Sequence, residues 1–80
     1  MVAAFVFIQI AGLSSLAEMS ALHGAMHAVP GVKTVHFVMG PTDVVAFVEA
    51  ADQKALIAAV AGIRALNGVG TTDTRMVLPI

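Results

Sequence analysis

The feature that most constrains the fold is an internal repeat with a period of 37 residues. Ser15 and Asp52, both of residue types that cap helix N-termini, lie 37 positions apart. The segments Pro30-Gly31-Val32 and Asn67-Gly68-Val69, which read as helix ends followed by strand starts, have the same separation. A repeat of this length has room for a strand, a helix and a second strand. The sequence therefore predicts two duplicated βαβ units.

The first repeat begins with a strand and a capped helix. Residues 2–10 are rich in β-branched and aromatic side chains, which favours a strand. Ser15 and Glu18 have the spacing of a capping box, so a helix should begin there and run to about residue 28. Residues 32–39 alternate in polarity and predict a second strand. The apolar stripe expected on the helix consists of Leu16, Met19, Leu22, Met26 and Val29.

The second repeat follows the same order. Residues 43–50 are an almost wholly apolar run, joined to the preceding strand by a loop short enough for a hairpin. Asp52 should cap a helix over residues 53–66, which Asn67-Gly68 ends. Residues 70–78 alternate polar and apolar side chains and predict a half-exposed strand. The apolar stripe expected on this helix consists of Leu56, Val60, Ile63 and Leu66.

The order of elements predicts an α+β fold. Right-handed crossovers applied to β-α-β-β-α-β give the ferredoxin-like arrangement, a four-stranded antiparallel sheet with two helices on one face. The strands at residues 2–10 and 43–50 become central, in agreement with their being the most apolar. We expect one domain over residues 1–80, with no helix-turn-helix domain.

The hydrophobic content points to an oligomer. Hydrophobic residues make up 59% of the chain, more than a monomeric core of this size can bury. Alternate positions in both registers of the central strands are apolar, with Phe5 and Phe7 on one face. Gln9 and Gly12 interrupt the longest charge-free stretch, so we expect no membrane span. The second face of the sheet should therefore bury against another subunit, giving a homo-oligomer.

Charge and residue content exclude several classes of function. Four basic and five acidic residues give a net charge of −1, too few cations to follow a phosphate backbone, so we expect no direct nucleic-acid binding. The chain has no cysteine, which excludes disulfides and thiolate metal sites. The apolar N-terminal stretch has no Lys or Arg ahead of it, so we expect a cytoplasmic rather than an exported protein.

Three histidines bear on metal binding. His23 and His27 lie four apart on the first predicted helix, a spacing that allows chelation, while His36 lies on a strand. No carboxylate or cysteine has a suitable spacing for a third ligand. We therefore expect solvent-exposed histidines at the edge of the domain, no metal site and no cofactor.

Three segments carry a resemblance to a known family. They are Pro30-Gly31-Val32, Gly40-Pro41-Thr42-Asp43 and Gly68-Val69-Gly70-Thr71-Thr72-Asp73-Thr74. In order and spacing they resemble the C-terminal ligand-binding domain of the Lrp/AsnC regulators of amino-acid metabolism, over essentially the whole chain. The resemblance implies dimers formed by packing two sheets face to face, assembled into rings with effector amino acids between dimers. It also implies that the family's usual helix-turn-helix is missing, which makes a DNA-binding relative a candidate partner for co-assembly.

The chemistry of a free amino acid selects five candidate ligand-binding residues. An ammonium needs an acceptor such as Asp43, while a carboxylate needs donors such as the hydroxyls of Thr72 and Thr74. Gly40 lets the ligand approach the backbone closely. The resemblance implies that the family builds its effector pocket at these positions, with Thr42 standing where the family has an aromatic residue.

Other interpretations remain open at this stage. Asp43 suits a hairpin turn, and Thr72 and Thr74 suit an ordinary strand. The leading function is a non-catalytic amino-acid sensor that acts through assembly. The alternatives are a small dimeric α+β barrel enzyme of oxygenase or isomerase type, with His36 as base, and an assembly module that binds no ligand.

Overall fold

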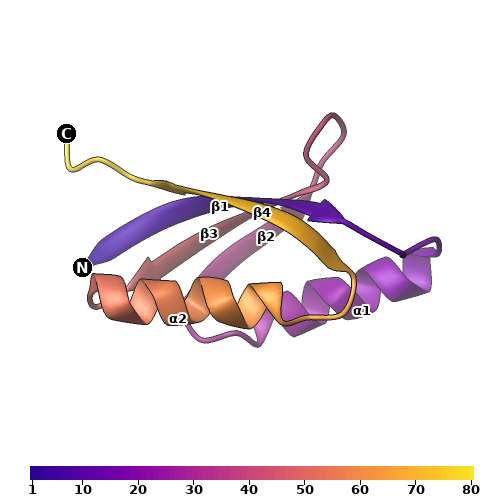
Figure 1. The fold of residues 1–80 in the computed structure, drawn as a ribbon, viewed down its shortest axis with the longest axis horizontal. Helices are drawn as coiled ribbons and strands as arrows, with labels where there is room; N and C mark the ends of the chain where they lie inside the picture. Colours follow the sequence, from indigo (N-terminus) through magenta and orange to yellow (C-terminus); the bar gives the residue numbers. More distant parts are fainter.

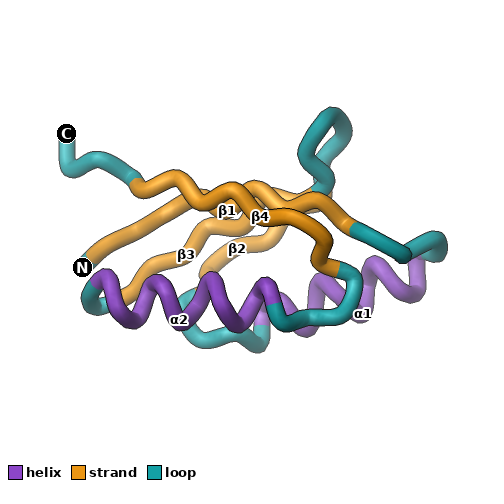
Figure 2. The backbone as a smooth tube through the Cα atoms, in the orientation of Figure 1, coloured by secondary structure: helices purple, strands orange, loops and turns teal.

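A computed structural model describes all residues, 1–80, and contains six elements in the order βαββαβ. They are β1 (Val2–Ile10), α1 (Leu16–His27), β2 (Val32–Phe37), β3 (Val44–Ala50), α2 (Gln53–Arg64) and β4 (Val69–Met76). The strands form one antiparallel sheet in the order β2-β3-β1-β4, and both helices cover the same face of it (Figures 1 and 2). The ferredoxin-like prediction is confirmed, including the central positions of β1 and β3. Neither helix is long and apolar enough to cross a membrane.

The core lies between the sheet and the two helices. Its 13 buried residues are all hydrophobic, and no polar or charged residue is buried. Every second residue of β1 and β3 points into this core, as the period of a strand requires. The core residues are Ala4, Val6, Ile8, Leu22, Met26, Val32, Val35, Val44, Ala46, Val48, Leu56, Ala59 and Ile63.

Helix α1 begins at the predicted capping box. The Oγ of Ser15 accepts a hydrogen bond from the Glu18 N–H at 3.1 Å, and Glu18 Oε1 accepts from the Ser15 N–H at 3.2 Å. The prediction that Leu16 belongs to the buried stripe is wrong, because its side chain is 83% exposed. The first turn of α1 projects beyond the end of the sheet (Figure 1), so nothing there covers Leu16. Deeper along the helix, Leu22 and Met26 are buried as expected.

The two helix-to-strand turns show the repeat in three dimensions. Gly31 precedes β2 with φ +98° and Gly68 precedes β4 with φ +100°, a backbone region that favours glycine. A Cβ on Gly31 would lie 3.0 Å from the Glu49 carbonyl oxygen, and one on Gly68 would lie 2.9 Å from Leu13 Cδ1. Both turns therefore require glycine for its conformation and for its size.

The face of the sheet away from the helices, called the open face below, carries an aromatic cluster. Phe5 pairs with Phe47 across β1 and β3, with ring centroids 5.0 Å apart, and Phe7 pairs with Val45. Phe5 is 43% exposed. The structure thus confirms that the central strands are apolar on both faces, and only one of these faces is covered by helices.

Candidate functional site

The loop between β2 and β3, residues 38–43, is fastened to the end of β1 by Asp43. The N–H of Asp43 donates to the carbonyl oxygen of Ile8 at 3.1 Å, and its Oδ2 accepts from the N–H of Ile10 at 2.9 Å. The N–H of Val38 donates to the Asp43 carbonyl oxygen at 2.9 Å and closes the loop. This closure ends β2 at Phe37, two residues earlier than the predicted end of the strand. Asp43 therefore sets the position of the loop relative to the sheet.

Gln9 joins this loop to the edge strand β4. Its Nε2 donates to the carbonyl oxygen of Pro41 at 2.8 Å, and its Oε1 accepts from the Thr71 hydroxyl at 2.9 Å. The side-chain amide of Gln9 thus binds two segments at once, because its NH₂ group donates to the loop and its oxygen accepts from β4. The two hydrogen bonds therefore hold the loop and the start of β4 next to the end of β1.

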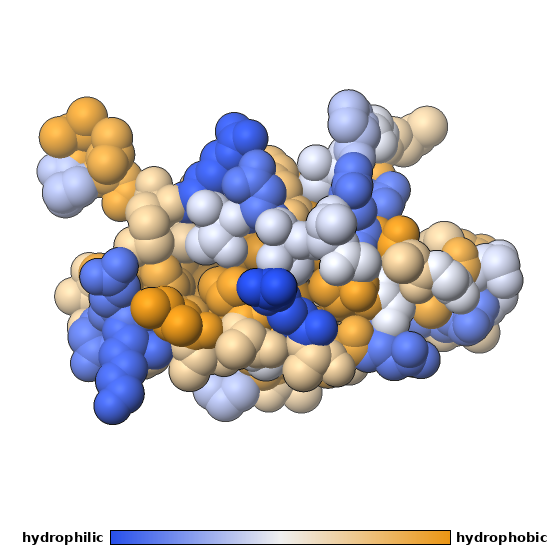
Figure 3. All heavy atoms as spheres, viewed as in Figure 1, coloured by the Kyte–Doolittle hydropathy of each residue, from blue (hydrophilic) through white to orange (hydrophobic).

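A polar hollow of about 350 Å³ lies at this junction. Arg75 lies over the ring of Phe7, 5.1 Å from its centroid, and its Nη2 is 3.0 Å from Asp73 Oδ2. An arginine, an aspartate and three threonines therefore line one small space. In Figure 3, polar side chains follow β4, while apolar surface lies between this strand and α2. The hollow is lined by Phe7, Gln9, Thr42, Thr71, Thr72, Asp73 and Arg75.

The five residues predicted from sequence do not all meet in this hollow. Thr42 and Thr72 line it, and Asp43 follows Thr42 with its carboxylate directed to the Ile10 amide. Gly40 lies in the exposed part of the loop, where φ is +126° and a Cβ would meet no atom within 4 Å. Thr74 pairs with Val6, on the helix-covered face, and lines a separate hollow of about 220 Å³ between α2 and β4.

Sequence reasoning missed Gln9, Thr71, Asp73 and Arg75 as lining residues. The polar row on β4 was visible in the sequence, because Thr71, Asp73 and Arg75 alternate with residues of the opposite face. The contribution of Gln9 depends on how β1 pairs with β4, and that register shifts between Ile8 and Ile10. Such an irregularity leaves no signal in the residue pattern.

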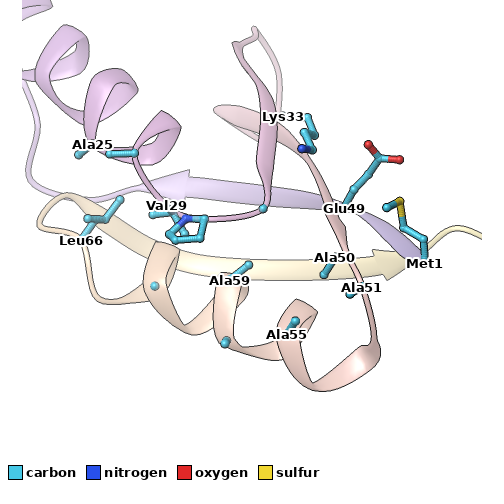
Figure 4. A pocket seen from close by; sticks show the side chains of 15 residues that line it. Met1, Ala25, Val29, Lys33, Glu49, Ala50, Ala51, Ala55, Ala59 and Leu66 are labelled. Carbon is cyan, nitrogen blue, oxygen red and sulfur yellow. The ribbon is translucent and has the colours of Figure 1, made fainter.

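The largest hollow, about 780 Å³, is a groove between the two helices. Ala59 of α2 lies on one side, and Ala25 and Val29 lie on the other (Figure 4). The charged side chains lining it, those of Lys33 and Glu49, come from the strands. Its walls are otherwise mostly short and apolar, so the groove offers no set of converging polar groups that would orient an amino acid. The polar hollow beside β4 remains the candidate site.

The enzyme alternative finds little support in this arrangement. Such an enzyme would need a catalytic cavity between the sheet and the helices, with polar groups inside it. The buried residues in that layer are all apolar. His36, the candidate base, is exposed on the edge strand β2 and pairs with Val45, which places it on the open face.

Comparison with known proteins agrees with the fold. The family model of the Lrp/AsnC ligand binding domain matches residues 3–79. The crystal structure of TTHA0845 from Thermus thermophilus is 34% identical, covers 100% of this chain and 96% of its own, and has a TM-score of 0.82. FFRP-DM1 is 28% identical, with coverages of 98% and 100% and a TM-score of 0.78.

A longer protein contains the same fold as one part. Escherichia coli AsnC is 20% identical, has a TM-score of 0.79, and is covered over 53% of its length by 99% of this chain. At this identity the match shows the fold alone. No curated protein sequence matches the chain.

Proposed function

This chain belongs to the family of Lrp/AsnC ligand-binding domains, and from that premise we propose that it binds a free amino acid and acts through assembly. Domains of this family are non-catalytic, bind small effectors and form oligomers. We propose that ligand binding in turn modulates transcription or amino-acid metabolism in the cytoplasm, through association with a DNA-binding relative.

The observation that carries this proposal is the polar hollow at the β2–β3 loop and β4. A free amino acid presents an ammonium and a carboxylate close together, so its site must supply acceptors and donors within a few ångströms. Thr42 and Thr72 are among the residues that line the hollow, and each carries a hydroxyl group that can donate. Asp43, directly after Thr42, has one carboxylate oxygen engaged by Ile10 and a second one available to an ammonium.

Two of the predicted residues lie outside the hollow, so they can contact a bound amino acid only in an assembled oligomer. Gly40 is exposed at the loop, and Thr74 lies on the other face of β4 from the hollow's charged pair. A ligand held between this surface and a neighbouring subunit would reach beyond the hollow itself. Gly40 and Thr74 are therefore proposed as flanking contacts, and Thr42, Asp43 and Thr72 as the main ones.

The proposed assembly uses the open face of the sheet. A partner packed against the aromatic cluster would bury the side chains of Phe5, Phe7, Val45 and Phe47, which the helices leave uncovered. Sheets that pack face to face in this way lie about 10 Å apart and interdigitate such side chains. The hollow would then lie at the rim of the dimer, where dimers meet in a ring.

Thermal unfolding in the presence of each standard amino acid tests the proposal. A ligand that binds only the folded chain raises the unfolding midpoint. We expect one or a few amino acids to do so, and Thr72→Val to reduce the shift because it removes the hydroxyl of a residue that lines the hollow. The control is Ser20→Ala, since Ser20 carries an exposed hydroxyl on helix α1, away from both the hollow and the open face of the sheet. If no amino acid raises the midpoint, the chain is better described as an assembly module without a ligand.

A further inference from the structure

The structure brings two histidines of α1 into contact on one side of the helix. His23 and His27 are one helical turn apart, and their ring centroids are separated by 4.7 Å with an interplanar angle of 60°. His23 is half-buried, and its ring centroid lies 6.1 Å from that of Phe37 on β2. His27 is exposed. One ring is therefore packed against the sheet while the other faces solvent beside it.

This separation suits two imidazoles that share a metal ion. With metal–nitrogen distances of about 2.0–2.1 Å, two ligands at adjacent coordination positions place their ring centres roughly 4.5–5.5 Å apart. The observed 4.7 Å falls in this range, and the tilt shows that the rings are not stacked in parallel. Contact with Phe37 restricts the His23 ring, which lowers the cost of ordering the pair.

We propose that His23 and His27 form an exchangeable surface chelate for a divalent transition metal. Imidazole nitrogens favour Cu²⁺, Ni²⁺ and Zn²⁺ over Mg²⁺ and Ca²⁺, which prefer oxygen ligands. The sequence argument against a metal site rested on the missing third ligand, and the structure contains no group of three or more His, Cys, Asp or Glu side chains that could hold a metal ion. That argument excludes a closed structural site, but a two-ligand chelate keeps its remaining positions open to water.

The chelate is independent of the proposed amino-acid site. The histidines lie on α1 and the hollow lies beside β4, at opposite edges of the sheet, because β2 and β4 are its two edge strands. A metal that joins residues of successive turns also favours the helical conformation of α1. Metal binding should therefore raise the thermal stability of the folded chain.

Calorimetric titration of the untagged chain with CuCl₂, NiCl₂ and ZnCl₂ near neutral pH tests this inference. We expect saturation at one ion per chain, with the tightest binding for Cu²⁺, as the Irving–Williams order predicts. His27→Gln should weaken binding by about tenfold or more, since one remaining imidazole loses the advantage of chelation. His27 is exposed, so this variant should keep its fold, which circular dichroism can verify.

The matched control is His36→Gln, because His36 is an exposed histidine on the open face of the sheet. Its metal affinity should equal that of the wild type. Equal affinities of the wild type and His27→Gln would overturn the inference, as would a loss of binding in His36→Gln. Binding of Mg²⁺ as tight as that of Ni²⁺ would also contradict a site made of imidazoles.

Discussion

The carboxylate of Asp43 accepts a hydrogen bond from the backbone N–H of Ile10, 33 residues away, at 2.9 Å. This contact lies where the pairing of β1 with β3 ends, since Ile8 pairs with Val44, the first residue of β3. Beyond that point a side chain, not a strand carbonyl, supplies the acceptor for the Ile10 amide. Asp43 is consequently a structural residue and a candidate ligand contact at once. Removing it tests both roles together, and an isosteric substitution is needed to separate them.

The first prediction separates these roles by comparing Asp43→Ala with Asp43→Asn. The alanine variant leaves the half-buried Ile10 N–H without a partner, which should lower the free energy of unfolding by about 1–3 kcal/mol. The asparagine variant keeps an acceptor oxygen and should lose less than about half of that. Urea unfolding of the two variants measures the difference, and equal stabilities would contradict the structural role.

The second prediction concerns the ligand affinity of Asp43→Asn. If Asp43 holds the ammonium of the bound amino acid, losing its charge removes a contact worth about 1.5–3 kcal/mol and weakens binding roughly 10- to 100-fold. The effector identified by thermal unfolding is the titrant. An unchanged affinity in the folded asparagine variant would show that the ammonium is held elsewhere, and Asp73 would be the next residue to test.

The third prediction concerns the open face. Phe5→Asp and Phe47→Asp each place a charge in the aromatic cluster, where a second sheet would have to pack. We expect both variants to remain folded and to sediment as smaller species than the wild type. Ile57→Asp on α2 is the control, because Ile57 is 62% exposed and lies on the other side of the molecule. A wild-type chain that is monomeric at micromolar concentration would contradict the proposed dimer.

The fourth prediction concerns the pH dependence of helix α1. The Ser14 N–H, and then the hydroxyl of Ser15, hold the pKa of the Glu18 carboxyl below its ordinary value of 4.5. A carboxyl whose pKa is lower in the folded state stabilises that state above its unfolded pKa. This contribution is lost as the pH falls from about 4.5 through the lower, folded value. An NMR titration of Glu18 should show the lowered pKa, and the lowering should become smaller when Ser15 is replaced by alanine. It should not vanish, because the backbone N–H groups of Ser14 and Ser15 still donate to the carboxylate.

The fifth prediction compares two glycines. Gly68 has φ +100° and no room for a Cβ beside Leu13, so Gly68→Ala should lower stability by about 1–3 kcal/mol. Gly24 lies inside α1 with open space around it, so Gly24→Ala should raise stability by about 0.5–1 kcal/mol. Thermal unfolding of the two variants should therefore give shifts of opposite sign.

The sequence was sufficient to predict the architecture because the relevant signals are local. The caps at Ser15 and Asp52 are side chains that hydrogen-bond within their own first turns, and both are present in the structure. The apolar character of β1 and β3 identified them as central strands. Burial at the periphery was harder to predict, and Leu16 shows why. A helical stripe gives the direction of a side chain, while exposure depends on where the sheet ends.

The candidate site was only partly predictable because it depends on the register between strands. The alternation of β4 separates Thr72 and Thr74 from Thr71 and Asp73, but it cannot show which face meets the β2–β3 loop. Thr72 lines the hollow together with Thr71, although the two are adjacent in the strand and Thr72 pairs with Ile8 of the core. The bridging role of Gln9 likewise follows from long-range contacts that no local pattern contains.

The most direct test of amino-acid sensing is a calorimetric titration of the wild-type chain with the amino acid that most raises its unfolding midpoint. The account predicts saturable binding that weakens in Thr72→Val and Asp43→Asn and is unchanged in Ser20→Ala. Absence of binding by every standard amino acid, or equal binding by all four proteins, would contradict it.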